Sequence, residues 1–493
     1  MNLYKYLFLI CLGMLFACEK EIQQPGGGKE PPINEEDERI KERIYYYFNE
    51  QSFWTEYIPD RNEEERKAFV KNYTSNTALL NALKGLTPFH SGYSGSIDRF
   101  SFLDESNAEG NTSSSYSDGI RMDTNDGYGL YYGWGRLSQT ATVVYPVIFF
   151  VEGGSPADKE GVKRGAIVYA VNDDEDITVR YNGGMNQTDA RRVEAKLESA
   201  LEASTLKLKL QSVDGEETDY TLNYQTYDIN PIVKDTIYKY ERNIGYLAYT
   251  SFEEVDTRTS TGAKNRQDLE DVFTSFEETN ISDLILDLRY NTGGYVEAAE
   301  YLAEKLIGSS GDGELMFSYD VNDYLASAPR YRNSFRDVYF SRKNNLELNH
   351  VYILVTQSTA SAAELLISSL KPYLNVTLIA EGNRTYGKPV GFFPEEITDN
   401  VTLWVTSFKT INADGYTDFW DGIIADITGV DDYIFLDFGD PEEDMIAKAL
   451  DLAGVSATTS SMRASSRMGT SAQRGVKLGI INKPRERNML KTK

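Results

Sequence analysis

The hydrophobic and polar positions divide the chain into stretches of different period. From residue 38 onward, apolar side chains recur at spacings of three and four, which predicts an amphipathic helix. The residues on that apolar face are Ile40, Ile44, Tyr47 and Phe48. Residues 76–83 are predicted to form a second helix, and a Ser-, Gly- and Asn-rich stretch at 101–126 predicts a loop. The pattern indicates an N-terminal helical domain over residues 38–115.

The next stretch, residues 116–230, is predicted to be rich in β-strands. Apolar and β-branched runs at 147–151, 166–171 and 206–210 are typical of buried strands. A helical pattern at 188–203 stands between the last two.

Residues 231–455 alternate between strand and helix patterns. The predicted strands lie at 244–248, 284–288, 351–355 and 377–380, and the predicted helices at 266–277, 295–307 and 361–373. This alternation indicates an α/β unit with a substantially parallel sheet. The predicted fold class is therefore a multi-domain α/β (α+β) protein, with a helical region, a β-rich module and an α/β domain.

Charge is distributed unevenly along the 493 residues. The formal net charge is −26, and such an acidic chain argues against nucleic acid and against electrostatic docking onto anionic lipid. The last segment, residues 456–493, instead holds nine Lys and Arg and one acidic residue. We expect a basic, disordered tail there, with docking onto the acidic body as the alternative.

The N-terminus carries a targeting signal. Lys5 precedes an apolar run at 6–16 that is too short to span a bilayer and fits a signal peptide. The run ends in Leu-Phe-Ala-Cys18, which resembles a bacterial lipobox, so Cys18 is the predicted lipidation site. The alternative is an ordinary signal peptide with an incidental cysteine. We therefore expect a signal peptide at 1–17, a flexible tether at 18–37, and a lipid-anchored protein of the cell envelope, on the periplasmic side or the outer-membrane surface.

Cysteine and histidine are too scarce for several kinds of chemistry. Cys11 would leave with the signal peptide, so the mature chain has no disulfide and no thiolate metal site. His90 and His350 are far apart and lie in no motif, which argues against a zinc site or a Ser-His-Asp triad. We expect neither a metal nor an organic cofactor.

Two short segments indicate Ser-Lys chemistry instead. Ser361 follows an apolar strand and begins a helix, where free backbone N–H groups favour an oxyanion; Ser358 is the second candidate. The alternative for Ser361 is a helix cap formed with Glu364. Lys388 lies in a Tyr-Gly-Lys-Pro turn, and a buried, neutral lysine can take the proton of a serine hydroxyl. The alternative for Lys388 is an ordinary surface charge.

A third segment, LILDLRYNTGG, is a predicted buried strand that ends at Gly293 and Gly294. Paired glycines let backbone N–H groups approach a ligand closely. One of these N–H groups, with that of Ala362 after the serine, could form an oxyanion hole. The alternative is a tight strand-to-helix turn.

The motifs SPADKEGVKRGAIVYAVN, GYLAYTSF, LILDLRYNTGG, STASAAE and TYGKP occur in this order. Over residues 127–450 the chain resembles the C-terminal processing (tail-specific) protease family of serine endopeptidases. The resemblance implies a crotonase-like or ClpP-like protease domain with Ser361 as nucleophile and Lys388 as base. It assigns the oxyanion hole to Gly293 or Gly294 and to Ala362.

The first of these motifs resembles a PDZ domain, which binds a peptide's C-terminus as an added strand. The matching glycine loop is Tyr128-Gly129-Leu130, unless it is only a turn between strands. The expected partners are therefore protein or peptide substrates held by their C-termini.

The chain departs from the family at Phe392, where many members carry a glutamine that orients the lysine. The interval from Ser361 to Lys388 is also slightly longer than the family pattern. These departures leave open a second interpretation, a non-catalytic peptide-binding lipoprotein on a protease-like fold.

Overall fold

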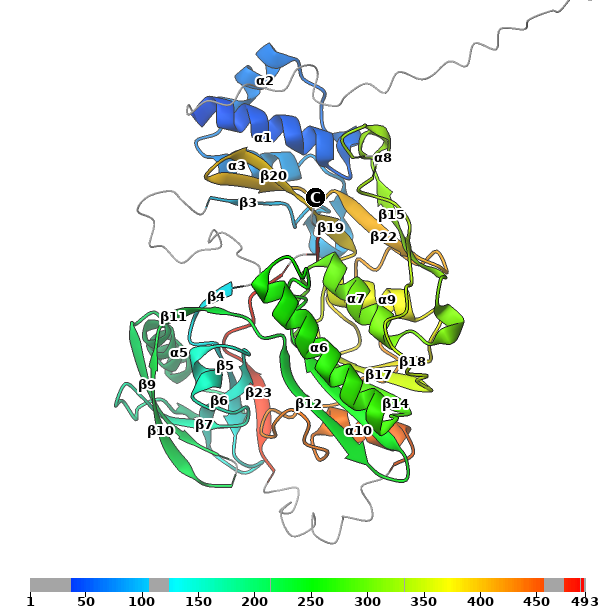
Figure 1. Cartoon of the computed structure of the whole chain (residues 1–493). Coiled ribbons are helices and arrows are strands. Elements are labelled where there is room, and N and C mark those ends of the chain that lie inside the picture. Colours follow the sequence, from blue (N-terminus) through cyan, green and yellow to red (C-terminus); the bar gives the residue numbers. More distant parts are fainter. Residues whose placement is uncertain are drawn as a thin grey trace, which may run out of the picture.

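The computed structural model describes residues 37–105, 124–212, 214–331, 333–455, 474–487 and 489–491. The predicted signal peptide, the tether and Cys18 lie outside these residues. In Figure 1 the N-terminal helices lie at one end of the molecule, and a β-rich body and an α/β body lie side by side at the other.

The N-terminal region contains both predicted helices and one that the pattern did not predict. Its elements are α1 (Asp37–Gln51), η1 (Thr55–Tyr57), α2 (Glu63–Val70), α3 (Asn76–Lys84), β1 (Phe89–His90), η2 (Ser91–Tyr93), β2 (Gly95–Ser96) and β3 (Phe102–Asp104). The apolar face of α1 packs against Ile397 and Leu403, which belong to the hairpin β20 (Pro394–Thr398) and β21 (Val401–Trp404). Since β21 also pairs with β3, a distant hairpin completes this region.

The β-rich body, named the β module, covers residues 124–228. Its elements are β4 (Thr124–Gly127), β5 (Leu130–Arg136), β6 (Val143–Val151), α4 (Pro156–Lys159), β7 (Ile167–Val171), β8 (Val179–Arg180), α5 (Gln187–Leu201), β9 (Thr205–Gln211), β10 (Glu217–Asn223) and β11 (Gln225–Asp228). The main sheet has the order β10-β9-β7-β6-β5-β23, so its last strand comes from the C-terminal segment. The apolar face of α5, which includes Val193 and Leu197, packs onto this sheet.

The α/β body is built on a five-stranded sheet of order β12-β13-β14-β17-β18, in which only β12 runs antiparallel to its neighbour. The strands are β12 (Ile232–Lys239), β13 (Asn243–Tyr249), β14 (Asp283–Asp287), β17 (His350–Val355) and β18 (Val376–Ala380). On one face lie α6 (Ser260–Thr279), α7 (Val296–Leu306) and α9 (Ala362–Leu370); on the other lies α10 (Asp444–Leu452). Helices cover both faces of the sheet, so each of these strands is a continuous apolar run in the sequence.

A second sheet of order β16-β15-β22-β19-β24 stands beside the first. Its strands are β15 (Leu315–Val321), β16 (Val338–Tyr339), β19 (Val390–Phe392), β22 (Phe408–Asn412) and β24 (Met489–Leu490), and the short helices η3 (Ser309–Gly311) and α8 (Asp323–Ser327) flank it. Strand β19 follows the turn that carries Lys388, so this sheet fixes one side of the site.

The C-terminal segment, described over residues 474–487 and 489–491, differs from the disordered tail that we expected, and residues 456–473 of that tail lie outside the described residues. It forms β23 (Val476–Ile480), which pairs antiparallel with β5, and β24, which pairs parallel with β19. Composition alone pointed to solvation, but the partners of this segment lie far away in the sequence. The alternative that we kept, docking onto the acidic body, describes these residues better.

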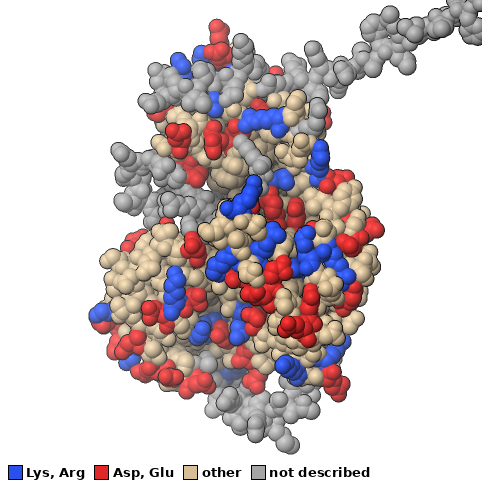
Figure 2. Space-filling model, in the orientation of Figure 1, with Lys and Arg blue, Asp and Glu red and all other residues tan. Residues whose placement is uncertain are grey.

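Acidic and basic side chains are interspersed over the face drawn in Figure 2. No helix among the described residues is long and apolar enough to cross a bilayer.

Candidate active site

Ser361 lies between β17 and α9, at the carboxyl end of a parallel strand. Its backbone has φ 62° and ψ −115°, a conformation that is costly for a residue other than glycine. The side chain is fully buried, yet within the described residues its hydroxyl has no hydrogen-bond partner. Buried hydroxyl groups are normally hydrogen-bonded, so this exception makes Ser361 a candidate functional residue. The helix cap that we kept as its alternative is present as well, because Glu364 accepts from the Ser361 N–H at the start of α9.

The predicted glycine turn follows β14 and reaches the same place. Gly293 and Gly294 have φ values of 122° and 138°. A Cβ atom on Gly293 would lie 2.8 Å from the Ser361 Cβ, and one on Gly294 would lie 2.1 Å from the Phe252 carbonyl oxygen. Only glycine permits these approaches. The N–H of Gly293 already donates to Asn291 Oδ1 at 3.0 Å.

Lys388 is buried, with 3% of its surface exposed. Its Nζ lies 5.0 Å from the ring centre of Phe100 and 5.4 Å from that of Phe392. It donates to the carbonyl oxygen of Arg487 at 3.4 Å. Burial among these rings lowers the pKa of Lys388 to about 8, because desolvation disfavours the ammonium form. The side chain is therefore not the surface charge that we kept as its alternative.

Glu364 joins the backbones of the two segments. Its Oε2 accepts from the N–H of Ser361 at 2.9 Å and of Lys388 at 2.8 Å. Its Oε1 accepts from the Gly387 N–H at 2.7 Å and from Thr385 Oγ1 at 2.5 Å. Burial raises the pKa of this carboxyl group, and the four hydrogen bonds oppose that rise. The sequence suggested Glu364 only as a partner in a helix cap.

Ser361, Gly293 and Lys388 converge, although they come from three loops. The Ser361 Oγ and the Arg487 carbonyl oxygen each lie 3.3 Å from the point where a Cβ of Gly293 would stand. Within the described residues, Ser361 Oγ and Lys388 Nζ are not hydrogen-bonded to each other. Ala362 is buried at the first position of α9, where backbone N–H groups have no partner within the helix. Ser358 is only half-buried, and its N–H donates to Thr356 Oγ1.

The sequence could not have pointed to Phe100 or Arg487 as neighbours of Lys388. Phe100 belongs to the N-terminal region and Arg487 to the C-terminal segment, and neither lies in a motif. Phe392, which we noted as a departure, forms one wall around the ammonium group. The ring supplies a non-polar face where glutamine would supply a hydrogen bond.

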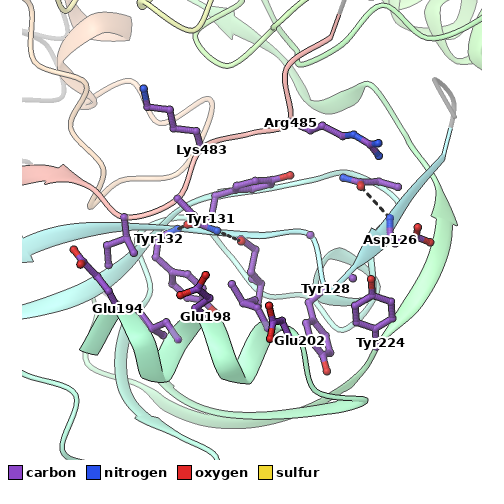
Figure 3. A pocket seen from close by; sticks show the side chains of 18 of the residues that line it. Asp126, Tyr128, Tyr131, Tyr132, Glu194, Glu198, Glu202, Tyr224, Lys483 and Arg485 are labelled. Carbon is purple, nitrogen blue, oxygen red and sulfur yellow. Dashed lines mark hydrogen bonds between the residues drawn. The ribbon is translucent and has the colours of Figure 1, made fainter. Parts of the chain in front are cut away.

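The predicted peptide-binding loop lies in a separate groove of the β module. A cavity of about 970 Å³ opens between β5 and α5, and Tyr128, Gly129 and Leu130 line part of it. In Figure 3, Glu194 and Glu198 of α5 stand on one side of this cavity and the C-terminal segment on the other. The structure does not bring these three residues to Ser361.

The C-terminal segment binds this groove through Asn482. Its Nδ2 donates to the Leu130 carbonyl at 3.1 Å, and its Oδ1 accepts from the Tyr132 N–H at 2.6 Å. An amide side chain therefore satisfies backbone groups of β5 beside the glycine loop.

A buried ionic cluster ties the β module, the α/β body and the C-terminal segment together. Asp432 is contacted by Arg164 Nη2 at 2.7 Å, Arg289 Nη1 at 2.9 Å, Tyr290 Oη at 2.7 Å and Lys477 Nζ at 3.0 Å. Burial alone would raise the pKa of Asp432, but these cations hold it well below the usual range. The cluster fixes the start of the segment that later reaches Ser361.

The two histidines contact other groups. His350 begins β17, and its Nε2 contacts Thr377 Oγ1 at 2.7 Å. His90 packs against the Tyr93 ring. Among the described residues, no group of three or more His, Cys, Asp or Glu could hold a metal ion.

The part of the chain that carries the glycine turn, Ser361 and Lys388 has recognisable relatives. Residues 243–428 match peptidase family S41. A carboxy-terminal processing protease, CtpA, of Bacillus subtilis is 28% identical over 266 residues, which are 53% of this chain and 48% of that protein. The chloroplastic carboxyl-terminal-processing peptidase 3 of Arabidopsis thaliana is 26% identical over 266 residues, 52% and 46% of the two chains. The chain spans about half the length of the curated relatives it matches.

A solved structure shares the fold over most of the chain. A crystal structure described as a putative S41 protease from Bacteroides fragilis superposes with a TM-score of 0.61 at 23% identity. The superposition covers 86% of this chain and 99% of the Bacteroides fragilis chain. The agreement extends the fold similarity beyond residues 243–428.

Proposed function

We propose that this protein is a serine endopeptidase that cleaves envelope proteins or peptides by a Ser-Lys mechanism. The observation that carries the proposal is the pairing of two unusual groups in one buried place. Ser361 has a strained backbone and a hydroxyl with no hydrogen-bond partner among the described residues, and Lys388 has a pKa of about 8. The match of residues 243–428 to peptidase family S41 supports a serine peptidase.

In the proposed reaction, the neutral amine of Lys388 takes the proton of the Ser361 hydroxyl as its oxygen attacks the peptide carbonyl. The resulting ammonium then gives that proton to the leaving amine. With a pKa of about 8, roughly a tenth of the lysines are neutral at pH 7. Before attack, Nζ must turn from the Arg487 carbonyl to the Ser361 hydroxyl. No metal or organic cofactor takes part in these steps.

Two backbone N–H groups are proposed as oxyanion donors. The N–H of Gly293 is engaged by Asn291, so we assign the donor in the glycine turn to Gly294. The second donor is Ala362, at the N-terminus of α9, where the helix dipole adds to the attraction for negative charge. Glu364 positions both segments by binding the Ser361 and Lys388 N–H groups.

The remaining parts of the proposal concern substrate delivery and location. The β module is proposed to be a PDZ-like domain that engages substrate C-termini through Tyr128, Gly129 and Leu130. Lipid on Cys18 would hold the protein at the cell envelope. The groove beside the glycine loop, between β5 and α5, supports the first of these statements.

The proposal is tested with Ser361→Ala and Lys388→Met, which remove the nucleophile and the base with little change in volume. Each should lower cleavage of an unfolded protein such as casein by at least about 10³-fold, with unfolding curves like the parent's. If either variant cleaved as fast as the parent, the assignment would be wrong.

A second candidate function, peptide binding without catalysis, is favoured by Phe392 and by the C-terminal segment that lies at Ser361. A serine-directed fluorophosphonate probe separates the two functions. A peptidase should form an adduct on Ser361 that requires Lys388, and a binding protein should form none.

A further inference from the structure

The described residues of the C-terminal segment pass the β module and then Ser361. After β23 and Asn482, it reaches Thr292 in the glycine turn. The Thr292 Oγ1 donates to the Arg485 carbonyl at 2.8 Å and accepts from the Arg487 N–H at 3.0 Å. This part of the segment is held through its backbone, as an extended peptide substrate would be.

The route continues beyond Arg487 with the same kind of contacts. The Leu490 N–H donates to the Gly294 carbonyl at 3.0 Å, and the Lys491 N–H donates to the Phe392 carbonyl at 2.9 Å. Met489 and Leu490 are buried where β24 pairs with β19. Figure 1 shows the segment in red between the β module and the α/β body.

The Arg487 backbone lies beside the two candidate catalytic residues. Its carbonyl oxygen accepts from Lys388 Nζ at 3.4 Å and lies close to the same point beside Gly293 as the Ser361 Oγ. Its side chain is 6% exposed, and Nη1 lies 2.8 Å from Glu253 Oε1. Its Nη2 lies 3.8 Å from Glu152 Oε1. We call the space around this guanidinium, bounded by Glu253 and Glu152, the Arg487 pocket.

The two carboxylates of this pocket differ in their surroundings. Glu152 also accepts hydrogen bonds from Tyr227 Oη at 2.5 Å and Asn125 Nδ2 at 2.6 Å. Glu253 is fully buried and lies in the loop between β13 and α6. A buried carboxylate is stable only with a cation or strong donors beside it, and arginine is suited to this task because it is weakly hydrated and always charged.

We propose that the described residues of the C-terminal segment are an intramolecular pseudosubstrate, and that Glu253 makes the Arg487 pocket select arginine or lysine as the substrate residue that precedes the cleaved bond. The inference rests on the proposed peptidase function and adds a substrate class to it. A substrate that displaced the segment would leave Glu253 buried without Arg487. A basic side chain at the attacked residue would replace that charge, whereas leucine would not.

The contacts of Lys388 also explain why the segment is not cleaved while it occupies the site. Lys388 Nζ is engaged by the Arg487 carbonyl, and the Ser361 hydroxyl has no partner within the described residues. Lys388 Nζ is therefore not hydrogen-bonded to the nucleophile while the segment is in place. Occupation of the site competes with substrate and lowers the activity of the full chain.

The first test uses fluorogenic peptides that differ only in the residue before the cleaved bond: Arg, Lys, Leu or Glu. In the full chain, kcat/KM for Arg and Lys should exceed that for Leu by about 30-fold or more, with Glu lowest. Glu253→Gln should bring the Arg-to-Leu ratio close to one. Glu254→Gln is the matched control, because Glu254 accepts from Thr259 Oγ1 at the start of α6, and its ratio should equal the parent's.

The second test measures how fast a fluorophosphonate labels Ser361. Arg487→Gln should accelerate labelling by about tenfold, because the segment loses its charged anchor. Arg487→Lys keeps the charge and should accelerate labelling less. A synthetic peptide of residues 474–493 should slow the labelling of the Arg487→Gln variant. If the parent cleaves too slowly to measure, the peptide ratio is read in Arg487→Gln.

The outcomes distinguish the inference from the function on which it rests. An Arg-to-Leu ratio near one, an unchanged ratio in Glu253→Gln, or equal labelling of the parent and Arg487→Gln would overturn the inference alone. If no variant cleaved any peptide and the probe did not label Ser361, the peptidase function itself would be wrong and the inference with it.

Discussion

Replacing Glu364 by glutamine tests whether one carboxylate holds together the segments that carry Ser361 and Lys388. The carboxylate accepts four hydrogen bonds, two at each oxygen, from the N–H groups of Ser361, Gly387 and Lys388 and from Thr385 Oγ1. Glutamine keeps the shape but turns one acceptor oxygen into an NH2 group. An NH2 group in place of Oε2 faces the N–H groups of Ser361 and Lys388, which are both donors. An NH2 group in place of Oε1 faces the Gly387 N–H, whereas the Thr385 hydroxyl can accept from it. At least one backbone donor therefore loses its partner.

The magnitude follows from these contacts. Hydrogen bonds to a charged group contribute about 1.5–3 kcal/mol each and neutral ones about 0.5–1.5 kcal/mol, so losing one bond and weakening the other three costs about 3–6 kcal/mol. Removing a buried charge returns several kcal/mol of desolvation energy. We expect Glu364→Gln to lower the free energy of unfolding by about 2 kcal/mol. We also expect a loss of about 100-fold in activity, because small displacements of reacting groups are costly.

Urea denaturation measures the first effect and the rate of Ser361 labelling by a fluorophosphonate measures the second. Glu396→Gln is the control, because this side chain is exposed on β20 and its replacement should change stability by no more than about 0.5 kcal/mol. If Glu364→Gln matched this control in both measurements, the positioning role would be refuted.

Two further substitutions test the close approach at Ser361 and the buried ionic cluster. Gly293→Ala places a methyl group 2.8 Å from the Ser361 Cβ at φ 122°, and casein cleavage should fall about 100-fold. Gly313 also has a positive φ, 82°, but nothing lies within 4 Å of the point where its Cβ would stand. Gly313→Ala should therefore cleave casein like the parent. Equal losses in the two variants would refute the steric argument. Asp432→Asn leaves buried cations without their partner and should lower the free energy of unfolding by about 3–5 kcal/mol in urea, whereas the exposed Asp414→Asn should not. A change below about 1 kcal/mol at Asp432 would show that the cluster does not stabilise the fold.

The sequence predicted the α/β body well because its strands are covered on both faces. The apolar run at 284–288 became β14, and the helix expected from 361 became α9. The same runs placed the glycine turn and Ser361 at neighbouring strand ends, where the parallel register brings them together. Local pattern was therefore sufficient for the part of the site that depends on sheet order.

The remaining parts depend on contacts between residues that are distant in sequence. The C-terminal segment has a composition typical of a solvated tail, but Lys477 pairs with Asp432 and Arg487 with Glu253. Likewise, the hairpin β20–β21 gave no sign that it would complete the N-terminal region. Nothing in the composition of a basic segment identifies the buried carboxylate that will accept it.

The most direct test of the account is the rate of Ser361 phosphonylation as a function of pH. Burial depresses the pKa of Lys388 to about 8, and its neutral form is the proposed base, so the rate should rise about tenfold per pH unit below 8 and level off above it. Lys388→Met should react much more slowly and without this inflection. A rate that did not depend on pH, or an inflection near 8 that remained in Lys388→Met, would contradict the assignment of Lys388 as the base.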